Sequence, residues 1–157
     1  MMGRALLVLG WISTTGIAYT GLLGFRTSVD GGLGTHLLVG LGSSLLLLFS
    51  HCWIMFYLIG TGKAVKTAVA EHDLDSEFVE ITKALKNRSY PALMLAMMVV
   101  MVTFIVGGGV ATRVIPAWIH SGLFFLSLAV QIRALLIEGS VLADNERLLA
   151  EVGSRSS

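Results

Sequence analysis

Apolar residues dominate four long stretches of the chain, and polar segments separate them. The four runs cover about residues 5–24, 37–59, 92–110 and 117–137. A membrane-spanning helix needs about 20 mostly apolar residues. None of the runs shows the alternation of apolar and polar residues that marks a strand of a membrane barrel. The pattern therefore predicts an all-α fold, an integral membrane four-helix bundle.

The polar segments predict how the spans connect. Short turns over about residues 26–34 and 111–116 join the spans into two antiparallel helical hairpins. The longer segment 61–90 keeps apolar residues at helical spacing, and so does the tail 140–157. We expect one membrane domain over residues 1–157, with a cytoplasmic helical hairpin at 61–90 and a cytoplasmic helical tail at 140–157.

The positions of the basic residues predict the orientation. One side of the predicted membrane carries Arg4, Lys63, Lys66, Lys83, Lys86, Arg88, Arg147 and Arg155, whereas the other carries Arg26 and Arg113. The positive-inside rule then places both termini in the cytoplasm, as in a multi-pass protein of a bacterial-type inner membrane. The first apolar run could instead be a secretory signal, but its length favours a span.

Composition narrows the classes of protein further. The 157 residues are 55% hydrophobic and only 13% charged, and the mean hydropathy is +0.81, which excludes a water-soluble globule. The single cysteine, Cys52, excludes an internal disulfide and a zinc site built on paired thiolates. A net charge of +1 lacks the basic surplus that is typical of nucleic-acid-binding proteins. No phosphate-binding or nucleophile motif occurs, so we expect a non-catalytic subunit rather than an enzyme.

Histidine and arginine recur in both hairpins. Arg26 is followed by His36 at the outer start of the second span, and Arg113 is followed by His120 at the outer start of the fourth. Both hairpins run from the inner to the outer side and back, so we expect a parallel repeat about an axis along the membrane normal. In a bundle with the helices in sequence order, this repeat places the two histidines at matching depth on diagonal helices.

Two histidines on diagonal helices predict a b-type haem with two axial imidazoles. Ionisable side chains inside lipid are costly and usually functional. Glycines near both histidines leave room for a porphyrin, and arginines can bind its propionates in bidentate fashion. We therefore expect His36 and His120 to ligate the haem iron, and Arg26 and Arg113 to bind the propionates. Other interpretations remain open: hydrogen-bonded packing histidines, a non-haem metal, or a proton or quinone site.

Another histidine, His51, lies on the same predicted helix as His36 and suggests a further site there. It lies 15 residues after His36, about 22 Å deeper. Methionines occur at this depth on the third span, and a thioether can be an axial haem ligand, so His51 with Met98 is a candidate second haem site. The alternative, which we favour, is packing with a hydrogen bond across helices, and Gln131 is a candidate partner.

The expected function follows from these placements. In its spans and ligand placement the chain resembles the four-helix membrane b-type cytochromes, with no contiguous family motif. The resemblance implies an electron-transfer subunit with haem b and a quinone or cytochrome as redox partner. The alternative is a cofactor-free scaffold or assembly subunit, because small residues along the spans favour close helix packing. In both cases we expect protein partners or a homo-oligomer in the lipid bilayer.

Overall fold

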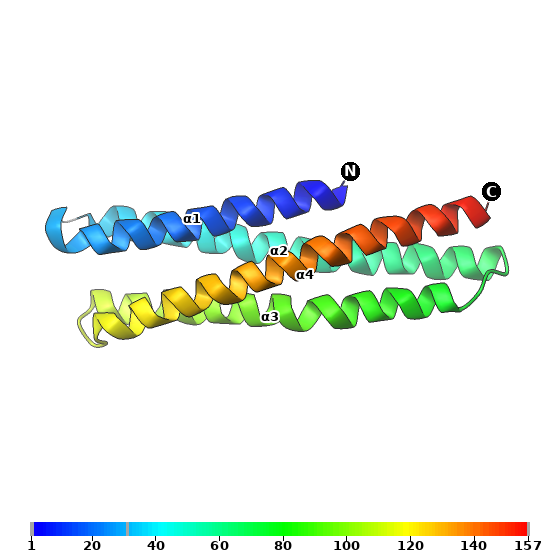
Figure 1. Ribbon diagram of the computed structural model, residues 1–157. Coiled ribbons are helices and arrows are strands. Elements are labelled where there is room, and N and C mark those ends of the chain that lie inside the picture. The colour runs from blue at the N-terminus through cyan, green and yellow to red at the C-terminus, as the bar shows by residue number, and fades with distance from the viewer. Residues whose placement is uncertain (1, 31, 157) are drawn as a thin grey trace.

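The protein folds into four long helices. The computed structural model describes residues 2–30 and 32–156, with the side chains of 27–30 excepted. The helices are α1 (Met2–Asp30), α2 (Leu33–Glu71), α3 (Glu77–Ala111) and α4 (Ala117–Arg155). Figure 1 shows the α1–α2 and α3–α4 connections at one end of the bundle, and the α2–α3 connection with both termini towards the other. The predicted all-helical bundle is confirmed.

All four helices are long and apolar enough to cross a membrane. With 39 residues, α2 and α4 are about 58 Å long, nearly twice the thickness of a hydrocarbon core of about 30 Å. Many large apolar side chains face outwards; Leu38, Phe56 and Trp118 are 73%, 69% and 74% exposed. A water-soluble monomer rarely exposes so much contiguous apolar surface, which suits a lipid environment.

The helices surround the bundle axis in sequence order. Each helix packs against its two neighbours, the backbones of α2 and α4 approach each other across the centre, and no Cα atoms of α1 and α3 come within 8 Å in the described residues. We call the end with the α1–α2 and α3–α4 connections the connection end, and the end with the α2–α3 connection the terminal end. The expectation that α2 and α4 form the diagonal pair agrees with these contacts.

Three of the helices continue past the start of α1 at the terminal end. In Figure 1 the N-terminus stops short of the α2–α3 connection, and α4 extends past the N-terminus towards that connection. Val65, Phe78 and Leu148 belong to the buried core of this three-helix part, and Arg88 on α3 pairs with Asp144 on α4 at 2.6 Å. The segments 61–90 and 140–155 therefore do form helices that continue the bundle.

Left-handed backbone at two non-glycine residues ends α2 and α3. Asp73 has φ 50° and Arg113 has φ 61°. At both places an amide bonds back to the carbonyl oxygen five residues earlier, from Leu74 to Val69 and from Val114 to Gly109. This is the bonding of a Schellman-type helix end, where glycine is the usual residue. Arg113 thus occupies a position that costs an ordinary side chain free energy.

Candidate functional site

The ring of His36 is held by a backbone contact from the neighbouring helix. His36 lies in the first turn of α2, and its Nδ1 is 2.9 Å from the carbonyl oxygen of Thr20 on α1. Gly24 lies beside the ring: a Cβ at that position would be 3.0 Å from His36 Cε1. The close approach of α1 to the imidazole therefore depends on glycine at position 24.

The second histidine has the same surroundings in the other hairpin. The Nδ1 of His120, near the start of α4, is 3.1 Å from the carbonyl oxygen of Thr103 on α3. A Cβ at Gly107 would be 2.9 Å from His120 Cε1. Threonine, glycine and histidine thus have equivalent roles in both hairpins, and the equivalent residues are 83, 83 and 84 positions apart along the chain.

These contacts fix the tautomer of both rings. A carbonyl oxygen only accepts hydrogen bonds, so Nδ1 must carry the proton in each histidine. The Nε2 lone pair is then free to bind a metal or accept a proton. Metal-ligating histidines commonly donate their other ring N–H to a backbone carbonyl in this way.

The two imidazoles lie next to each other between α2 and α4. Their ring centres are 6.2 Å apart and their planes are 86° apart. Two imidazoles that bind one metal on opposite sides have centres about 6 Å apart, given metal–nitrogen bonds of about 2 Å. The separation of the rings therefore fits a metal held between them.

A cavity surrounds the histidine pair. It has a volume of about 430 Å³ and receives residues from all four helices. Ser44 and Ser127 line it on the side of the bundle centre, and Phe104 and Arg113 line it towards the surface. Ligand cavities in proteins commonly have volumes of about 300–1,000 Å³. The connection end of the bundle thus has a cavity of ligand size, whereas the main apolar core lies towards the terminal end.

The structure separates the two arginines that the sequence pairs. Arg113 lines the cavity. Arg26 does not; it borders a different hollow, on α1, together with Tyr19, Leu22 and Phe25. Only Arg113 is thus placed to bind a carboxylate of a ligand in the cavity.

The described residues contain no cluster of three or more His, Cys, Asp or Glu side chains that could hold a bare metal ion. A haem needs only axial ligands from the protein, since the porphyrin supplies the other four nitrogens. His36 and His120 together offer two ring nitrogens, fewer than the four ligands of a typical structural metal site.

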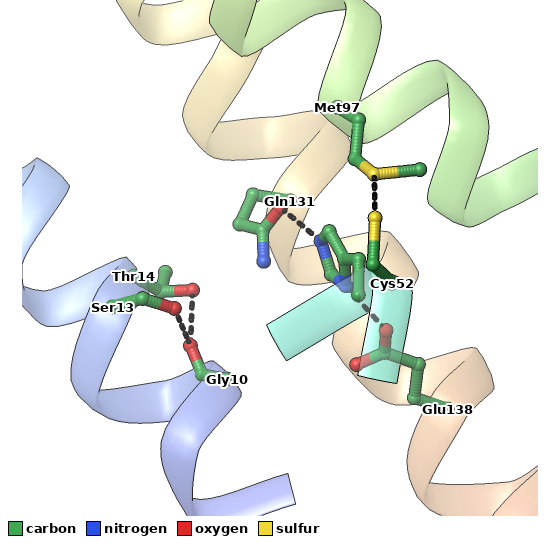
Figure 2. Close-up of polar contacts among 8 residues, drawn as sticks. Gly10, Ser13, Thr14, Cys52, Met97, Gln131 and Glu138 are labelled. Carbon is green, nitrogen blue, oxygen red and sulfur yellow. Dashed lines mark hydrogen bonds and ion pairs between the residues drawn. The ribbon is translucent and has the colours of Figure 1, made fainter. Parts of the chain in front are cut away.

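His51 belongs to a separate, fully buried network. Its two contacts are both to α4, to Gln131 and Glu138, which Figure 2 labels. Nδ1 is 2.5 Å from Glu138 Oε1, and Nε2 is 3.0 Å from Gln131 Oε1; all three residues are 0% exposed. Because both ring nitrogens have partners, His51 offers no free nitrogen to a metal.

The candidate methionine ligand faces away from this network. Met98 is 56% exposed on the surface of α3, whereas the neighbouring Met97 receives a contact from Cys52 Sγ at 3.9 Å. The structure therefore does not bring His51 and Met98 together as a ligand pair. It supports the alternative, a hydrogen-bonded histidine that joins α2 to α4.

Sequence reasoning missed the residue that matters most to His51. Glu138 lies directly after the fourth apolar run, where a charged residue is common, so its position alone indicates no special role. A better signal is its spacing of seven from Gln131, because residues seven apart lie on the same helix face.

Comparison of the chain with models of known protein families, with curated proteins and with solved structures found no match. The functional argument therefore depends on the geometry of the two sites.

Proposed function

We propose that the protein is a membrane b-type cytochrome-like electron-transfer subunit that binds one haem b, with His36 and His120 as axial ligands. The observation that carries this proposal is the histidine pair, with both Nδ1 atoms bonded to carbonyl oxygens and the ring centres 6.2 Å apart. When bound, the haem would supply an iron that accepts and releases one electron.

The residues of the chain have distinct tasks in this proposal. The carbonyl oxygens of Thr20 and Thr103 orient the imidazoles and fix the proton on Nδ1, so that Nε2 can bind a metal. Gly24 and Gly107 allow the rings to lie close to α1 and α3. Arg113 binds a haem propionate from the rim of the cavity, a charge-assisted contact that guanidinium groups make well. The proposal does not use Arg26, because it lies outside the cavity.

The membrane placement is part of the proposal. The two hairpins form a parallel repeat, which the equivalent threonine, glycine and histidine contacts support. The excess of lysine and arginine at the terminal end favours a cytoplasmic location for both termini in a bacterial-type inner membrane. The haem would then lie near the outer face, within reach of a quinone or cytochrome partner in or on the bilayer.

An optical spectrum tests the haem proposal directly. Protein purified in mild detergent should show a reduced-minus-oxidised difference spectrum with the sharp bands of six-coordinate haem b. His36→Ala and His120→Ala should each lose it, because each removes one ligand. His72→Ala is the matched control, since His72 is exposed in the α2–α3 connection and should not affect the spectrum.

Two results would overturn the proposal. Retention of the spectrum in both ligand variants would refute the ligand assignment. A colourless, folded wild-type protein that co-purifies with stoichiometric membrane partners would instead favour the scaffold function.

A further inference from the structure

A line of buried polar residues runs along α4. Ser127, Gln131, Glu138 and Asn145 are 2%, 0%, 0% and 1% exposed. Their spacings of four, seven and seven place them on one face of the helix, which is turned into the bundle. We call these four residues the polar face of α4. It extends from the cavity, which Ser127 lines, to Asn145, near the level at which α1 begins, where Gly3 lies beside Leu142 and Glu146.

Several atoms of this region lack a hydrogen-bond partner. Among the described residues these are Gln131 Nε2, Glu138 Oε2 and Asn145 Nδ2 on α4, and Ser50 Oγ on α2. Ser50 Oγ and Glu138 Oε2 lie close to each other beside α1, since both are 3.7 Å from the point where a Cβ of Gly10 would be, and Leu135 Cδ2 packs at that point, 2.6 Å away. In Figure 2 the second carboxylate oxygen of Glu138 points towards α1.

Water is the ligand that fits these atoms. Buried polar groups in proteins are almost always paired, with protein or with ordered water. A buried water needs two to four polar partners, and here donors and acceptors recur along one helix face.

The His51–Glu138 pair adds a group that can bind protons. Gln131 Oε1 accepts the proton of His51 Nε2, so one further proton lies between Nδ1 and Glu138 Oε1 in either charge state of the pair. Glu138 Oε2 remains open to water. Uptake of a proton from a hydronium ion forms an O–H bond at Oε2 and leaves a water behind. The shared proton then belongs to Nδ1, and release is the reverse.

We propose that His51 and Glu138 form a buried proton-binding site, and that water bound along the polar face of α4 supplies it from the terminal end. Asn145, whose Oδ1 accepts a hydrogen bond from Thr61 at 3.1 Å, is the next polar residue on the face beyond Glu138. Seven residues of helix, about 10 Å, separate it from Glu138. The proposal does not depend on the haem.

Proton exchange at His51 tests both parts of the proposal. Protein labelled with ¹⁵N-histidine is placed in lipid nanodiscs and transferred to D₂O, and NMR follows the ring proton on Nδ1. Its signal is assigned by its loss in His51→Asn. In the wild type this proton should exchange at least tenfold faster than the amide protons of Leu47 and Ile54, which lie in the dry core of the same helix. Glu138→Gln should lose the shared-proton signal.

Two variants test the route. Asn145→Leu, which fills the same space without polar atoms, should slow the exchange about tenfold, and the control Ser140→Ala, exposed on the same helix, should leave it unchanged. Ser50→Ala, which removes the unpartnered hydroxyl near Glu138 Oε2 without adding bulk, should also slow it and serves if Asn145→Leu does not fold. Exchange as slow as that of the core amides would refute the proton site. Wild-type rates in both variants would refute the route.

Discussion

Replacement of Gly107 by alanine tests whether the site depends on the exact position of the His120 ring. A Cβ at Gly107 would be 2.9 Å from His120 Cε1, closer than real carbon contacts come. Ordinary van der Waals contact begins at about 3.5 Å, so the ring must move by about half an ångström. Metal–ligand distances tolerate only about 0.2 Å, and changes next to a ligand typically lower metal affinity 10- to 100-fold.

We therefore expect Gly107→Ala to bind haem at least tenfold more weakly than the wild type, measured by titration of the haem-free protein with haem and absorbance detection. Gly42→Ala is the matched control, because Gly42 lies within the helix α2, does not line the cavity and has no atom within 4 Å of its Cβ position. Both substitutions raise helix propensity by about 1 kcal/mol, so propensity cannot explain a difference. Equal haem affinity in the two variants would refute the argument from ring position.

Three further predictions concern stability, measured by reversible unfolding in mixed detergent. Glu138→Leu should lower the free energy of unfolding by about 3–5 kcal/mol, because it leaves His51 buried without its charged partner. The double variant with His51→Leu should recover much of this loss, and additive losses would contradict the prediction. Gly21→Ala should cost about 1–3 kcal/mol, because its Cβ would lie 2.2 Å from Phe124 Cζ, and a neutral result would show that Phe124 moves freely into the cavity. Arg113→Gly should raise the free energy of unfolding by about 1 kcal/mol, because glycine adopts the left-handed backbone without strain, and it should weaken haem retention. A lower free energy of unfolding would show that the guanidinium has a structural role.

Hydropathy predicted the four helices but not their lengths. The apolar runs end where polar residues begin, for example at residue 59, whereas α2 continues to Glu71. The continuation is amphipathic and packs as a three-helix part around Val65, Phe78 and Leu148, so its limit is set by tertiary packing. An averaged hydropathy detects the apolar length that is needed to cross lipid. How far each helix continues beyond that length depends on the helices against which it packs.

Within the apolar runs it was harder to predict which face of each helix packs against the other helices. On α3 the residues that face the bundle include Ala92, Ala96 and Thr103, whereas Met94 and Met98 are exposed. In lipid both faces can be apolar, and the inner face is the one with small residues that allow close packing. The proposal of a methionine ligand depended on the opposite orientation.

Local sequence symmetry located the histidine pair but overestimated the equivalence of the arginines. His36 and His120 have the same helical surroundings, so their relation in the sequence carries over to space. Arg26 lies within α1, whereas Arg113 lies in a connection after α3 has ended, so their side chains leave the backbone in different directions. Glu138 pairs with His51 on another helix, and a sequence pattern within one helix cannot show such a partner.

The hydrogen bonds of the two histidines have a consequence for how the protein assembles. His36 bonds to α1 and His120 bonds to α3, so each imidazole is oriented by the other helix of its own hairpin. Each hairpin can therefore enter the bilayer with its half of the site already formed, and only the meeting of the two hairpins completes it. Two separately expressed halves, divided in the α2–α3 connection, should then combine, and a ligand that joins both histidines would hold the halves together.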